Sequence, residues 1–235
     1  MVGYKHILQA MDEYVQKCSV TLKDVRAAIE PLIDELVGDD YVEKKVLMED
    51  IPRFYRDAYT LDRETCVCYS HDGILYENKG GSRMEVGIPE EAVKVANREG
   101  LMYGMHNHPV SVGAQSEQDF MVMAGLDMKY SICCGKGSIT IAKKEGDVSL
   151  PVLKLANAMH TMENMSDIKK NADNLGITKI RDDYSAGKIS KSENNSLMEK
   201  ALTKYFNDNF DSEVSSTQTT FDNFDIPIKY VGIKL

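Results

Sequence analysis

Two histidines in the middle of the chain are spaced to bind a single metal ion. His106 and His108 flank one asparagine and follow a short apolar run, residues 101–105, that predicts a buried strand. Because side chains alternate along a strand, both imidazole rings project to the same face. The pair therefore predicts two nitrogen ligands for one metal.

A third ligand candidate, Asp119, follows in the same segment. Ser116 is placed to cap a helix over residues 116–128, so Asp119 falls in its first turn, where a carboxylate suits the positive end of the helix dipole. The loop before this helix can fold Asp119 back beside the histidines. Two imidazoles and one carboxylate leave the fourth tetrahedral position open, which is typical of a catalytic zinc site, whereas structural sites are closed by four protein ligands.

These residues resemble a known family signature. The JAMM, or MPN-plus, metalloproteases share an upstream Glu followed by His-x-His, seven residues, Ser, two residues and Asp. The matching positions in this chain are Glu64, His106, His108, Ser116 and Asp119. The resemblance covers roughly residues 63–143. The His-Asn-His-Pro form and the preceding Arg63-Glu64 are closer to the prokaryotic and phage-associated branch, which includes the RadC-like proteins, than to eukaryotic deubiquitinases.

The resemblance implies a function and a mechanism. It implies a zinc-dependent metallopeptidase or isopeptidase, with Zn²⁺ held by His106, His108 and Asp119 and a zinc-acidified water as nucleophile. Glu64 would be the general base, and Ser116 would donate a hydrogen bond to the oxyanion. The partner would be a protein or peptide substrate, a ubiquitin-like protein among the candidates. The alternative is a non-catalytic scaffold or a nucleic-acid-associated module of the RadC-like kind.

Several assignments have competitors. Glu77 and Glu85 could serve as the upstream Glu; we prefer Glu64 because it opens a strand in the Arg-Glu context. Ser116 could be a plain helix N-cap, and its hydroxyl can serve only one of the two roles at a time. The remaining histidines are expected to be ordinary polar residues: His71 lies in a predicted turn, and two lie on helical stretches, His6 and His160.

The elements that must position these residues predict an α/β fold. The resemblance specifies a JAB/MPN-like (cytidine-deaminase-like) three-layer domain with a mixed β-sheet over residues 61–150. Two regions flank this domain. The N-terminal region, residues 1–60, is predicted to be helical, with Thr21 as an N-cap, and the C-terminal region covers residues 151–235. The C-terminal region is predicted to be helical through about residue 209. A polar linker over residues 211–223 and a terminal strand over residues 226–235 are predicted to follow.

Within residues 61–150, the pattern alternates between strands and helices. Strands are predicted over residues 65–69 and 74–76 around an Asp72-Gly73 turn, then over 83–88, 101–105, 130–134 and 138–143. A helix is predicted from Pro89 to about residue 98, in addition to the helix at 116–128. This alternation is typical of α/β domains.

Composition narrows the class of protein. A net charge of −9 argues against general affinity for nucleic acid. No run approaches the roughly 18 apolar residues of a membrane span, so we expect a cytoplasmic protein without a membrane partner. The five cysteines show no paired spacing for a disulfide framework or an all-cysteine zinc site. Buried free thiols are therefore the expectation.

Overall fold

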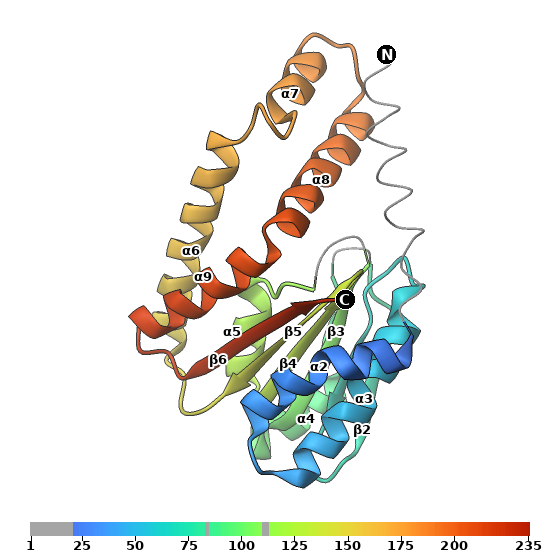
Figure 1. The fold of residues 1–235 in the computed structure, drawn as a ribbon, viewed down its shortest axis with the longest axis vertical. Helices are drawn as coiled ribbons and strands as arrows, with labels where there is room; N and C mark the ends of the chain where they lie inside the picture. The colour runs from blue at the N-terminus through green and yellow to red at the C-terminus, as the bar shows by residue number, and fades with distance from the viewer. Residues whose placement is uncertain (1–20, 83–84, 110–112) are drawn as a thin grey trace.

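A six-stranded mixed β-sheet runs through the centre of the fold (Figure 1). The computed structural model describes residues 21–82, 85–109 and 113–235. The strand order is β2-β1-β3-β4-β5-β6, and only β3 and β4 are parallel. The strands are β1 (Cys66–Tyr69), β2 (Leu75–Asn78), β3 (Leu101–His108), β4 (Met128–Gly135), β5 (Ser138–Lys144) and β6 (Ile228–Lys234). The predicted α/β class with a mixed sheet is confirmed.

The parallel pair β3 and β4 positions the candidate site. A parallel connection needs a crossover, and helix α5 (Glu117–Gly125) supplies it. The carboxyl ends of β3 and β4 therefore lie side by side, with His106 opposite Cys133 in the register. The histidines stand at the end of β3, immediately before the loop that leads to α5.

Two N-terminal helices cover one face of the sheet. Helix α2 (Leu22–Val37) begins at the predicted N-cap Thr21, which forms a capping box with Asp24, and α3 (Tyr41–Tyr59) follows it. Their apolar residues recur at helical spacing and pack against the sheet. This core includes Val25, Ile29, Ile33, Leu47 and Ile51 from the helices and Tyr103, Ile132 and Ile141 from the strands. The predicted helical character is thus confirmed for residues 22–37 and 41–59; residues 1–20 lie outside the described part.

Four other helices cover the opposite face. They are α4 (Glu90–Glu99), α5, α6 (Leu150–Lys170) and α9 (Phe210–Asn223). The ring of Phe120 on α5 meets that of Phe221 on α9 edge to face at 4.9 Å. With helices on both faces, the fold has three layers. All three predicted regions of the chain contribute residues to these cores, and β6, the predicted terminal strand, pairs with β5 at the edge of the sheet.

A helical arm extends away from the sheet (Figure 1). It is built from the far part of α6, from α7 (Ile177–Ser185) and from α8 (Lys191–Asp208). Helix α8 has no fully buried residue, whereas Ile177 and Ile180 of α7 are buried. No helix in the described part of the chain is long and apolar enough to cross a bilayer.

Residues 211–223 are helical, so the predicted polar linker is wrong. They form most of α9, because four residues recur at helical spacing on one face: Phe210, Val214, Thr217 and Phe221. Phe210, Thr217 and Phe221 are buried. The polar composition that predicted a linker belongs to the solvated face of the same helix.

The predicted strand over residues 83–88 is also not found, since the described residues 85–88 are irregular and residues 83–84 lie outside the described part. Backbone hydrogen bonds of Ser82 take its place. The Ser82 amide donates to the carbonyl of Glu85 at 2.8 Å, and the Ser82 carbonyl accepts from the amide of Glu64 at 2.6 Å. These bonds satisfy backbone groups that a strand would have paired with a neighbour.

Candidate metal centre

The two motif histidines point to one side of β3 and meet at their ring nitrogens. Their Nε2 atoms lie 3.2 Å apart, and the rings are tilted by 62° with centroids 5.0 Å apart. Asn107, between them, projects to the other side of the strand and is buried. The alternation predicted from the sequence thus brings both imidazoles together.

Asp119 joins the histidines from the first turn of α5. Its Oδ1 lies 3.3 Å from Nε2 of His106. Ligand atoms about 2.0–2.1 Å from one zinc in tetrahedral geometry are roughly 3.3 Å apart. The separations of His106 Nε2 from His108 and from Asp119, 3.2 and 3.3 Å, are each close to the spacing of two ligands on one zinc ion. Both His106 and Asp119 are largely buried, with 13% and 21% of their side chains exposed.

Ser116 orients Asp119. The two residues form a capping box at the start of α5, in which the Ser116 hydroxyl and amide donate to Asp119 Oδ2 at 2.7 and 2.6 Å. The Asp119 amide returns a bond to the Ser116 oxygen at 3.3 Å. One carboxylate oxygen is thereby held by the cap, and the other faces His106. In this structure the Ser116 hydroxyl has the N-cap role.

The loop before α5 is tied down by residues that the motif does not include. The Gly113 amide donates to Oγ of Ser138 at 2.8 Å, and a Cβ at Gly113 would lie 2.6 Å from the Cys133 carbonyl oxygen, so only glycine fits there. The Gln115 amide donates to the hydroxyl of Tyr230 on β6 at 3.0 Å, and its side chain donates to the Ser131 carbonyl at 2.8 Å. Strands β4, β5 and β6 thus hold the loop that returns Asp119 to the histidines.

Cys133 on β4 is the site residue that sequence reasoning missed. It is fully buried, and its Sγ lies within 4.8 Å of a ring nitrogen of His106 and of His108. We expected buried free thiols, and the four cysteines of the described part are buried and free. The sequence does place two cysteines, a residue type that binds metals, in a predicted strand after the motif. It does not indicate whether Cys133 or Cys134 faces the histidines.

The close packing of these groups changes their pKa values. Burial on its own would lower the pKa of His106, but the neighbouring Cys133 and the Asp119 carboxylate outweigh it and raise that pKa well above its usual value. Burial likewise acts to raise the pKa of the Cys133 thiol, and His106 and His108 outweigh it and lower that pKa. Without a metal, the site therefore favours protonated imidazoles beside a thiolate and a carboxylate, and a bound cation would take the place of the protons on the ligating nitrogens.

Glu64 lies just before β1, and Asn107 fastens the segment that carries it. The side-chain oxygen of Asn107 accepts from the amide and hydroxyl of Thr65 at 2.7 and 3.0 Å, and its nitrogen donates to the carbonyl of Arg63 at 3.1 Å. The residue between the two histidines thus holds both neighbours of Glu64. This contact between β3 and the start of β1 was not predicted.

Glu64 differs from the two competing glutamates in its surroundings. It is buried, with 8% of its surface exposed. Burial raises the pKa of its carboxyl, the nearby His108 and His106 lower it, and Asp119 and Glu85 add to the rise. These influences place Glu64 within electrostatic range of the candidate ligands. Glu77 and Glu85 are exposed, and Glu77 pairs with Lys79 at 2.9 Å.

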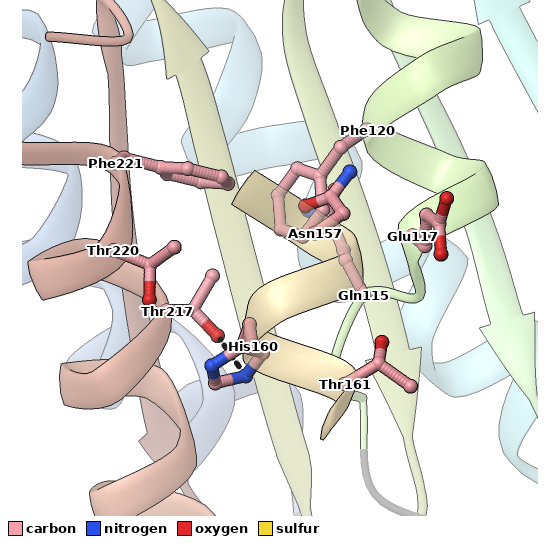
Figure 2. Close-up of a pocket in the computed structure, with 9 residues that line it drawn as sticks. All are labelled: Gln115, Glu117, Phe120, Asn157, His160, Thr161, Thr217, Thr220 and Phe221. Carbon is pink, nitrogen blue, oxygen red and sulfur yellow. Dashed lines mark hydrogen bonds between the residues drawn. The ribbon is translucent and has the colours of Figure 1, made fainter. Parts of the chain in front are cut away.

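The other described histidines lie outside this site. His71 is exposed in the turn between β1 and β2. His160 on α6 bonds to Glu213 at 2.8 Å and to the Thr217 hydroxyl at 3.2 Å on α9, beside a cavity of about 30 Å³ between α5, α6 and α9 (Figure 2). That cavity holds only a few water molecules and is too small for a peptide. His6 lies among residues 1–20, outside the described part.

The capping role of Ser116 makes a prediction about stability. Replacing Ser116 with alanine removes the side-chain half of the capping box, so we expect the free energy of unfolding to fall by about 0.5–2 kcal/mol. Urea denaturation of the metal-free protein measures this without the contribution of bound metal. Ser116→Thr keeps a capping hydroxyl and is expected to remain near the parent value. Equal stability of the alanine variant and the parent would contradict the role.

Comparison with known proteins does not identify this chain: no protein-family model, curated protein or solved structure matches it significantly.

Proposed function

We propose that this protein is a zinc-dependent metallopeptidase of the JAMM type that hydrolyses an amide or isopeptide bond. The observation that carries the proposal is the convergence of His106, His108 and Asp119, with ligand-atom separations of 3.2 and 3.3 Å that suit one zinc ion. The match of Glu64 and Ser116 to the two remaining positions of the signature supports the proposal. By the same reasoning we infer that the sheet and its covering helices form a JAB/MPN-like domain.

In this mechanism the chain's own residues bind the metal and move a proton. When bound, zinc would supply Lewis-acid chemistry, acidifying water to a pKa of about 7 and polarising the substrate carbonyl. Glu64 accepts the proton of the attacking water and later gives it to the leaving amine. Its buried position, within electrostatic range of the histidines, suits a general base, because burial raises the pKa of its carboxyl.

Two other residues support the reacting groups. Asn107 positions Glu64 through its bonds to Arg63 and Thr65. Ser116 holds Asp119 through the capping box. For the oxyanion role that the resemblance implies, the Ser116 hydroxyl turns from Asp119 toward the developing charge, while the Ser116 amide keeps its bond to Asp119.

The substrate class follows from the same resemblance. A carbonyl carbon attacked by water, with an amine as leaving group, is the chemistry of peptide and isopeptide bonds. We propose a protein or peptide substrate, with ubiquitin-like conjugates among the candidates. The protein's net charge of −9 favours basic over acidic partners at long range.

The test is metal-dependent cleavage of a defined set of substrates. The purified full chain is incubated with a peptide library and with isopeptide-linked ubiquitin-like conjugates, and products are measured by mass spectrometry. We expect cleavage that a chelator abolishes and that stoichiometric zinc restores. Cleavage that survives complete removal of zinc, or no cleavage of either class by the zinc-loaded protein, would overturn the proposal.

A further inference from the structure

We propose that Cys133 is a direct ligand of the metal, so that the resting centre is closed by four side chains: His106, His108, Asp119 and Cys133. The inference shares with the proposed function only the metal site, and it adds a thiolate to the donor set. A centre with an open fourth position would then be the exception, formed only during reaction.

Strand register places Cys133 on the metal side of the sheet. Cys133 on β4 is the partner of His106 on the adjacent parallel strand β3. Registered residues on neighbouring strands share a face, and the strands lie about 4.8 Å apart. The next residue, Cys134, projects to the opposite face and packs in the core beneath α2 and α3. The register therefore selects one cysteine of the pair for the site.

Proximity brings the sulfur within reach of the same ion. The Sγ atom of Cys133 and a nitrogen of each histidine all lie within 4.8 Å of one another. Asp119 approaches the same His106 nitrogen, at 3.3 Å, from α5. Two further donor atoms thus approach the two histidines of β3, the buried Cys133 sulfur from β4 and the Asp119 carboxylate from α5.

The donor set has a chemical consequence. Two imidazoles, a carboxylate and a thiolate are all accepted by zinc, at about 2.0–2.2 Å for nitrogen and oxygen and about 2.3 Å for sulfur. A thiolate ligand shifts preference toward zinc and softer ions and away from magnesium or manganese. With four side chains bound, a reacting water must enter as a fifth ligand or displace one of the four, and zinc expands to five-coordination in some catalytic sites.

Cobalt(II) provides the direct test, because a cobalt–thiolate bond absorbs strongly in the near ultraviolet and bonds to nitrogen and oxygen do not. The full-length metal-free protein, kept reduced, is titrated with cobalt. We expect a thiolate-to-cobalt charge-transfer band in the parent. The band should disappear in Cys133→Ala and Cys133→Ser, while cobalt still binds. Cys134→Ala is the matched control, since it removes the neighbouring buried thiol from the opposite face and should keep the band.

Zinc affinity gives a second readout. Outer-sphere substitutions typically weaken metal binding by about 10–100-fold, so loss of a ligand at Cys133 should raise the zinc dissociation constant at least roughly 10-fold. Cys134→Ala should leave it unchanged. The serine variant nearly preserves side-chain volume and keeps the test valid if the alanine variant folds poorly.

The outcomes separate this inference from the proposed function. Cobalt bound without the band, or a band that persists without Cys133, overturns the thiolate ligand and leaves the three-ligand hydrolase intact. A parent that binds no cobalt or zinc overturns both. A Cys133-dependent band in a zinc-loaded protein that cleaves no amide supports the ligand and overturns the hydrolase.

Discussion

The double substitution His106→Ala/His108→Ala is expected to abolish zinc binding and hydrolysis together. The parent should hold about one zinc ion per chain, and the variant none, because it removes both nitrogen ligands and leaves only Asp119 and Cys133. Hydrolysis should fall to the background of the assay, because without zinc no group in the site acidifies the attacking water. Elemental analysis of the purified proteins after reconstitution with zinc and desalting measures the first effect, and product formation measures the second.

A histidine outside the site gives the matched control. His71→Ala removes an exposed imidazole from the turn between β1 and β2 and should keep zinc content and activity at the parent level. Circular dichroism establishes that each variant is folded. Zinc retained by the folded double variant would show that the metal binds elsewhere. No zinc in the parent would instead favour the non-catalytic scaffold.

Glu64→Gln is expected to keep the zinc and lose most of the rate. Glutamine preserves the size of the side chain but cannot take up the proton of the attacking water. General acid–base catalysis typically contributes about 10²–10⁴-fold, so we expect kcat/KM to fall within that range. Zinc is measured on the same sample, which separates loss of the base from loss of the metal.

The competing glutamates are the controls for this experiment. Glu77→Gln and Glu85→Gln change exposed carboxylates and should leave kcat/KM within about twofold of the parent, because neither faces a desolvated site. If the Glu85 variant loses the rate and the Glu64 variant keeps it, the assignment of the base is wrong. Equal, modest losses in all three would indicate a general electrostatic effect of negative charge near the centre.

The helices and most strands were predictable because their signals are local. The helix at α4 and the caps at Thr21 and Ser116 follow from spacing and capping residues. The terminal strand also appears where alternation predicted it. Such signals depend on the backbone over a few residues, so they can be read from the sequence without knowledge of the tertiary structure.

Two errors have a common origin in contacts that the local sequence pattern does not report. Residues 211–223 form a helix because Phe210 and Phe221 find a core built by α5 and β6. Residues 85–88 are not a strand, because the backbone of Ser82 bonds to Glu85 and to Glu64, which lies far back along the chain. Strand β3 includes both histidines, as their predicted alternation required, and β1 pairs with it on one side through His106 and β4 on the other through His108. In each case the partner segment decides the structure.

The sequence by itself determined the local part of the candidate site. Strand alternation places His106 and His108 on one side of β3, and the spacing of Ser116 and Asp119 forms a capping box that holds one carboxylate oxygen. Only the tertiary structure decided that Gly113 and Gln115 anchor the loop on three strands, that Asn107 holds the segment of Glu64, and that Cys133 rather than Cys134 faces the histidines. The reason is physical: periodicity and capping follow from dihedral angles over a few residues, whereas the register of β3 against β4 follows from packing summed over the whole sheet.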